Sequence, residues 1–136
     1  MEKKIKAAMV VILNQEKKVL LLKRSPGPHW MPEKWALVGG HVEKGELPED
    51  AAIRETKEET TLVLKNLWHL RDQCTLSIYY STEHSGNVEI DFEHTDWAWV
   101  AYDELNNYDT TPNLEEIVKS TLGILDHFWL ACEAEK

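Results

Sequence analysis

Three glutamates, Glu55, Glu58 and Glu59, are spaced so that they could bind a metal ion. On an α-helix, positions i, i+3 and i+4 point to one side, so the three carboxylates would share a stripe. Like charges at this spacing destabilise a helix, and Lys57 would point to the opposite side. Carboxylate oxygens are hard ligands that suit Mg²⁺ or Mn²⁺. The stripe therefore indicates a divalent-metal site, the alternative being an acidic helix face in contact with solvent.

The glutamates belong to a longer pattern in residues 40–62. This segment fits G-x5-E-x7-R-E-U-x-E-E-x-G-U, where U is an apolar residue, with matches at Gly40, Glu46, Arg54, Glu55, Glu58, Glu59 and Leu62. The pattern resembles the Nudix box. Two positions depart from it, because Thr56 replaces an apolar residue and Thr61 replaces glycine. The Thr56 hydroxyl can bond back to the preceding turn, whereas a β-branched Thr61 is unfavourable where a helix ends with positive φ.

Nudix enzymes use water and a divalent metal to split a nucleoside diphosphate linked to another moiety, so the resemblance implies that reaction with Mg²⁺ or Mn²⁺. The ligands that carry over are the carbonyl oxygen of Gly39, with that of Gly40 as the alternative, and the side chains of Glu55, Glu58 and Glu59. Catalysis is expected from Arg54, Glu55 and Glu58, with one of the glutamates as the base. Arg54 precedes Glu58 by four positions, so it can pair with that carboxylate and orient it. Glu46 could orient the metal ligands or charge the start of the helix.

Glu93 is the candidate for one more metal ligand. The resemblance places an acidic ligand or a base in a loop before a late strand, where Glu93 and His94 occur. The alternative is that Glu93 lies on the solvent face of a strand, together with Glu89, Asp91 and Asp96. For His94 we expect a surface position rather than a role as the base.

Arg24 and Trp35 are the candidates for substrate binding. Arg24 follows an apolar strand and could contact a phosphate or base, the alternative being a solvated strand end. Trp35 could stack on a nucleobase, because a flat ring gives contact area at little entropic cost, or it could pack in the core. The same two alternatives apply to Trp30 and to the pair formed by Tyr79 and Tyr80.

Positioning these residues requires a sheet and helices. The expected elements are a hairpin of buried strands at 7–13 and 18–23, a loop at 25–34, strands at 35–38, 62–64, 73–80 and 96–100, a helical turn at 102–105, and helices from Pro48 and over 112–130. We expect Ala52, Ile53, Thr56 and Thr60 to pack on the sheet. The order is α/β and similar to the Nudix fold, an α/β/α sandwich with a mixed β-sheet.

Composition limits the partners. With 136 residues, the chain is expected to form a single domain over 1–136. The formal charge of −9 and the absence of a basic cluster argue against nucleic acid, but not against a nucleotide bound with metal ions. The apolar run near the start is too short for a membrane helix, and two cysteines are too few for a disulfide framework. We expect a cytoplasmic protein that does not bind membranes; a homodimer remains open.

The first functional hypothesis is a MutT-like nucleoside-triphosphate pyrophosphatase that releases a nucleoside monophosphate and pyrophosphate. The short chain favours it, because little sequence remains for an additional substrate-binding domain. The alternatives are a hydrolase of nucleotide sugars or dinucleoside polyphosphates, and a non-catalytic nucleotide-binding module. The clustered acids of the segment 54–59 argue against the binding module, which has no need of them.

Overall fold

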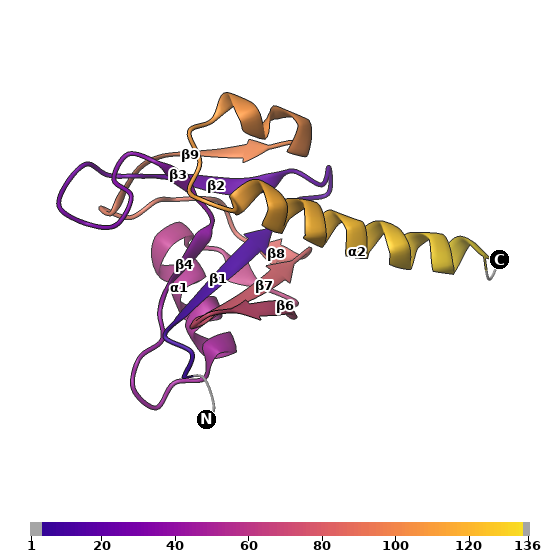
Figure 1. Cartoon of the computed structure of the whole chain (residues 1–136), viewed down its shortest axis with the longest axis horizontal. Coiled ribbons are helices and arrows are strands. Elements are labelled where there is room, and N and C mark those ends of the chain that lie inside the picture. Colours follow the sequence, from indigo (N-terminus) through magenta and orange to yellow (C-terminus); the bar gives the residue numbers. More distant parts are fainter. Residues whose placement is uncertain (1–3, 135–136) are drawn as a thin grey trace.

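A mixed four-stranded sheet is the centre of the fold (Figure 1). The structure, a computed structural model, describes the backbone of residues 4–134 and the side chains of residues 4–126. The strand order is β4-β1-β7-β6, in which β1 and β7 are parallel and the other pairs are antiparallel. The strands span Ala7–Ile12 (β1), Val38–His41 (β4), Trp68–Gln73 (β6) and Leu76–Ser81 (β7). The predicted mixed sheet is therefore confirmed.

Two smaller sheets and the helices complete the fold. An antiparallel sheet has the order β3-β2-β9, and β5 pairs with β8. These strands span Val19–Arg24 (β2), Trp35–Ala36 (β3), Val63–Leu64 (β5), His84–Ser85 (β8) and His94–Val100 (β9). The helices are α1 (Pro48–Thr60), the 3₁₀ helix η1 (Tyr102–Asn107) and α2 (Leu114–Ala134). Within residues 4–134, no helix combines the length and apolar character that a bilayer span requires.

The core has two parts because alternate residues of a strand face opposite sides. On one side Val10 of β1 packs in a cluster with Ala51 and Ala52 of α1. On the other side Val11 of β1 packs in a cluster with Ile117 of α2. The mixed sheet thus lies between α1 and α2, which is the expected α/β/α arrangement (Figure 1).

The predicted hairpin is wrong, although both of its strands exist. β1 joins the mixed sheet, while β2 pairs with β3 and β9. An isolated bridge between Leu13 and Val19 joins their ends. Both strands are apolar and buried, so their sequences give no sign of which neighbours they take.

Other predicted strand boundaries also differ. The strand expected at 73–80 is β7, which begins later, at Leu76, because a turn in which Cys74 has a φ of 55° separates it from β6, a strand that was not predicted. β9 begins at His94, earlier than expected, and the preceding residues 86–93 lie outside the strands, so the proposed strand face through Glu89, Asp91 and Glu93 is wrong.

The helices begin and pack almost as predicted. Pro48 occupies the first turn of α1, but Pro112 lies in a turn before α2 rather than in its first turn. Ala52, Thr56 and Thr60 are buried as expected. Ile53 is 41% exposed, so its predicted packing on the sheet is wrong.

Candidate functional site

Two glycines of β4 let α1 approach the sheet closely. Gly39 and Gly40 pair with Met9 and Ala8 of β1. A Cβ on Gly40 would lie 2.4 Å from Cδ of Glu55, and a Cβ on Gly39 would lie 2.4 Å from the carbonyl oxygen of Ala8. The Gly39 N–H donates to Oε1 of Glu59 at 2.9 Å. The glycines therefore set the distance between β4 and the glutamates.

Local hydrogen bonds account for both departures from the box. The hydroxyl of Thr56 donates to the carbonyl of Ala52 at 2.7 Å, which is the predicted bond to the preceding turn. Thr61 ends α1 with a φ of 65°, the conformation that a β-branched residue disfavours. Its N–H donates to the carbonyl of Lys57 and its hydroxyl donates to the carbonyl of Asn87. These two bonds hold the helix end in place.

Arg54 links the acidic residues of α1 to the loop before it. Its Nε and Nη2 donate to the two carboxylate oxygens of Glu46 at 2.8 and 3.0 Å. Its Nη1 donates to Glu55 at 2.8 Å and to Glu58 at 3.1 Å. The predicted pairing of Arg54 with Glu58 is therefore present. Glu46 acts on the other glutamates through Arg54, whose pKa it raises further by accepting these hydrogen bonds.

The three glutamates of α1 differ in their exposure to solvent. The side chain of Glu58 is 57% exposed, that of Glu55 is 16% exposed, and that of Glu59 is 5% exposed. Burial raises the pKa of Glu55, an effect that Arg54 opposes. Burial raises the pKa of Glu59 to about 9, and the charge of Glu55 adds to the effect. A cation next to these carboxylates would relieve both the burial of charge and the repulsion.

A buried histidine faces Glu59, contrary to the surface position predicted for His94. The His94 side chain is 3% exposed and its Nδ1 lies 2.7 Å from Oδ1 of Asp91. Its Nε2 lies 3.7 Å from Oε2 of Glu59. One donor atom from each of Glu59, Asp91 and His94 lies within 4.8 Å of the others, a grouping that fits a metal ion. Asp91 and His94 were not predicted to join this grouping; their spacing of three around a turn was the available signal.

The predicted ligands Glu93 and Gly39 are close to this grouping. Glu93 is exposed on the turn before β9, and its charge raises the pKa of Glu55 and Glu59. Gly39 contacts Glu59 through its N–H. Metal binding by Glu93 and by the Gly39 carbonyl stays a prediction.

The two predicted substrate-binding residues lie in different environments. Arg24 donates from Nε to the carbonyl of Trp30 at 2.7 Å, and its guanidinium lies 5.7 Å from the centre of the Trp30 ring. The next residue, Ser25, donates its N–H to the Glu93 carbonyl, which places Arg24 beside the acidic site. Trp35 is partly buried and packs edge-to-face on Tyr108 at 5.0 Å. The packing interpretation thus accounts for Trp35, and its stacking on a base stays a prediction.

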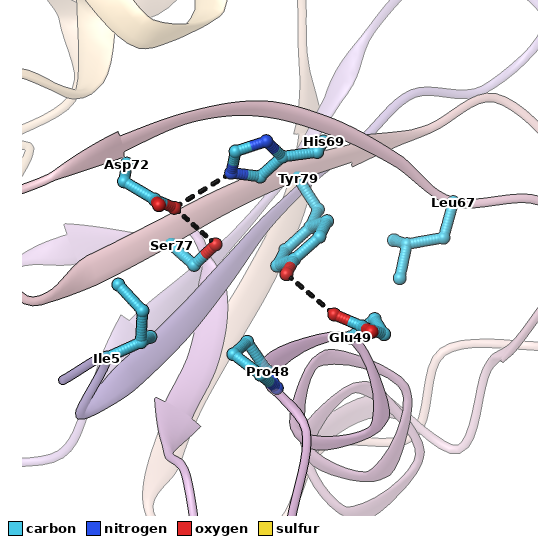
Figure 2. Close-up of a pocket in the computed structure, with 8 residues that line it drawn as sticks. All are labelled: Ile5, Pro48, Glu49, Leu67, His69, Asp72, Ser77 and Tyr79. Atoms are coloured by element: carbon cyan, nitrogen blue, oxygen red, sulfur yellow. Dashed lines mark hydrogen bonds and ion pairs between the residues drawn. The ribbon is translucent and has the colours of Figure 1, made fainter. Parts of the chain in front are cut away.

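A pocket of about 450 Å³ lies next to the first turn of α1, at the end of the helix away from the three glutamates (Figure 2). There the Tyr79 hydroxyl donates to Glu49 at 3.1 Å, and Asp72 accepts from Ser77 at 2.7 Å. Ile5, Pro48, Leu67 and His69 complete the lining. The pocket adjoins the first turn of α1, whereas Glu55, Glu58 and Glu59 lie in the second half of the helix. Tyr79 is buried and bonded here, so it is not placed to stack on a base at the acidic site.

The raised pKa of Glu59 predicts how stability depends on pH when metal is absent. The pKa rises from 4.5 to about 9 on folding, so this group's contribution is fully present below pH 4.5 and is lost as the pH approaches 9. We expect the melting temperature in excess chelator to fall between about pH 5 and pH 9, and to fall less in Glu59→Gln. Glu115→Gln, an exposed acid on α2, should behave like the wild type. A wild-type melting temperature that is constant over this range would contradict the prediction.

Comparisons with known proteins identify relatives of this chain. The family model described as the NUDIX domain matches residues 3–121. The bis(5'-nucleosyl)-tetraphosphatase [asymmetrical] of Caenorhabditis elegans is 32% identical over 113 residues, which cover 70% of this chain and 78% of the relative. The nucleoside triphosphatase NudI of Klebsiella pneumoniae is 31% identical over 117 residues, which cover 72% and 83%. The crystal structure of a MutT NUDIX hydrolase from Burkholderia pseudomallei aligns with a TM-score of 0.74 at 23% identity, covering 88% of this chain and 98% of that one.

Proposed function

Because this chain belongs to the Nudix family, we propose that it hydrolyses a nucleoside triphosphate to a nucleoside monophosphate and pyrophosphate, with Mg²⁺ or Mn²⁺ as its cofactor. The observation that carries this proposal is the arrangement around Arg54. One guanidinium holds Glu55 and Glu58 side by side, while Glu59 is fixed by β4. The acids are thus oriented by α1 and by β4, as metal ligands in a hydrolase must be. A solvated helix face would not require these contacts.

The residues that would hold the metal are Glu55, Glu58 and Glu59, with the Gly39 carbonyl and Glu93 as additional oxygen donors. A bound divalent ion neutralises phosphate charge and lowers the pKa of water. Glu55 and Glu58 are the candidates for the base, because Arg54 Nη1 holds both carboxylates next to each other. Arg54 itself stays bonded to Glu46 and the His41 carbonyl, so it orients the acids rather than the substrate.

Arg24 is suited to contact the anionic substrate. The chain has a formal charge of −9, so a triphosphate needs local positive charge in addition to the metal. Arg24 lies at the end of β2 beside the turn that carries Glu93, and Trp35 lies on the neighbouring strand β3. We therefore place the nucleoside near Arg24 and Trp35, next to the acidic site. The likeness to the triphosphatase NudI supports the choice of substrate.

A dinucleoside polyphosphate is the second candidate substrate. The likeness to the asymmetrical tetraphosphatase of Caenorhabditis elegans, over most of both chains, favours it over a nucleotide sugar. Both candidates require attack of water on a phosphate chain, so the same acids would serve either one. The two differ in their products.

A product analysis tests the proposal. The protein is incubated with nucleoside triphosphates, dinucleoside tetraphosphates and nucleotide sugars in ¹⁸O-labelled water with Mg²⁺, and the products are resolved by mass spectrometry. We expect a labelled monophosphate or pyrophosphate from triphosphates, and no product in excess chelator. Orthophosphate as the main product from triphosphates contradicts the proposal, whereas cleavage of dinucleoside tetraphosphates alone establishes the second candidate. No cleavage of any substrate points to a binding module.

A further inference from the structure

His94 and Glu59 face each other without a direct hydrogen bond. Nε2 of His94 and Oε2 of Glu59 face each other at 3.7 Å, which is longer than a hydrogen bond. Both side chains are almost completely buried, at 3% and 5% exposure. The other carboxylate oxygen of Glu59 already accepts the Gly39 N–H. Within residues 4–126, neither facing atom has a hydrogen-bond partner.

Asp91 determines which nitrogen of His94 carries the proton. An ionised carboxylate can only accept a hydrogen bond, so the 2.7 Å contact requires the proton of the imidazole to be on Nδ1. In the neutral ring, Nε2 then presents its lone pair toward Oε2 of Glu59. In many metal sites, a histidine binds the ion through one ring nitrogen and donates a hydrogen bond from the other to a carboxylate, which orients the ring. His94 and Asp91 have this arrangement.

The gap has the dimensions of a metal site. Bonds of about 2.1 Å from Nε2 and Oε2 to one ion would span 3.7 Å at an angle of roughly 120°. The charges of Glu55, Glu93 and Asp91 all act on Glu59, so the surroundings are negative. An imidazole nitrogen suits Co²⁺ or Zn²⁺, whereas Mg²⁺ and Mn²⁺ prefer oxygen donors.

We propose that His94 Nε2 and Glu59 Oε2 together bind a transition-metal ion, with Asp91 as the positioning residue that sets the tautomer of His94. This position lies between Glu59 and His94 of β9, whereas Arg54 holds Glu55 and Glu58, which remain available to an oxygen-preferring ion. The proposal deepens the metal requirement of the proposed function. The chain therefore discriminates between metals through His94 and not only through its glutamates.

Binding of Co²⁺ alone to the full chain tests this proposal without reference to hydrolysis. Co²⁺ and Mg²⁺ are titrated separately into wild type, His94→Gln and His69→Gln by calorimetry, and the visible absorption of Co²⁺ is recorded. We expect His94→Gln to weaken Co²⁺ binding by roughly 10- to 100-fold and to change its absorption, while Mg²⁺ binding changes by less than about twofold. His69→Gln is the matched control, because His69 also bonds an aspartate but lies at the distant pocket. Equal Co²⁺ affinity in wild type and His94→Gln overturns the proposal.

Nitrogen NMR of the wild type tests metal binding by His94 directly, so it does not require that His94→Gln folds. We expect the Nε2 resonance of His94 to shift when Zn²⁺ is added and to stay in place with Mg²⁺. If Nε2 still carries a proton in saturating Zn²⁺, the nitrogen does not bind the metal, and the proposal is overturned. Both tests measure metal binding and not hydrolysis. The metal proposal can therefore hold even if no nucleotide is cleaved, and it can fail even if the protein hydrolyses nucleotides with Mg²⁺.

Discussion

Glu58→Gln is expected to lower turnover by at least roughly 100-fold while the protein stays folded. The substitution removes one negative charge from the acidic site but retains a carbonyl oxygen that can accept from Arg54. Since the Glu58 side chain is 57% exposed, its replacement leaves the core unchanged. One candidate metal ligand and one candidate base are lost together, so the effect should appear in kcat rather than in KM alone.

The measurement is steady-state turnover at saturating Mg²⁺ and nucleotide, with circular dichroism and melting temperature as checks of folding. Glu115→Gln is the matched control, because it neutralises an exposed glutamate on α2, outside the site. Wild-type turnover in Glu58→Gln would exclude Glu58 from both of its assigned roles.

Gly40→Ala and Gly39→Ala should damage different properties of the protein. A Cβ at position 40 meets the end of a side chain, with Cδ of Glu55 at 2.4 Å, so that carboxylate must move. A Cβ at position 39 meets backbone atoms, the carbonyl oxygen of Ala8 at 2.4 Å and Cα of Met9 at 2.8 Å, which cannot move without opening the sheet. We therefore expect Gly40→Ala to fold and lose roughly 100-fold in kcat/KM, because misplacing a site group costs about this much. Gly39→Ala should lose roughly 1–3 kcal/mol of stability, as an overpacked core does.

Urea denaturation and turnover, measured for each variant, separate the two effects. Gly123→Ala provides the control, because its added Cβ would meet no atom within 4 Å beyond its own turn of α2, and alanine favours a helix by up to about 1 kcal/mol. A fully active Gly40→Ala would show that the position of Glu55 is not critical. A stable Gly39→Ala would show that β1 and β4 can separate more easily than their contact indicates.

The parts of the site that sequence predicts are those encoded locally. Glu55, Glu58 and Arg54 lie on one helix, where spacing alone fixes which side chains meet, and the structure shows their contacts. His94 and Asp91 meet Glu59 only because β9 pairs with β2, with Arg24 opposite His94. That register depends on contacts between distant segments, so a single sequence does not reveal it.

The errors in the fold have the same origin. The predicted hairpin assumed that consecutive strands pair, which is the common arrangement, but β1 and β2 join different sheets. The edge strand β6 was missed because its residues, Trp68–Gln73, are largely polar and partly exposed. Ile53 is apolar, so it was expected to pack on the sheet, but it lies where α1 faces solvent. Packing against partners far along the chain decided each case.

The parallel pairing of β1 with β7 has a consequence for the order of folding. Ala7 lies opposite Leu76, so β1 gains this neighbour only after α1 and β6 have been synthesised. Contacts between such distant segments slow folding, because a long loop must close before they form. A nascent chain that ends before β7 lacks Tyr79, which belongs to the cluster that covers α1. On the ribosome, the acidic helix should therefore acquire its ability to bind metal only after β7 has emerged.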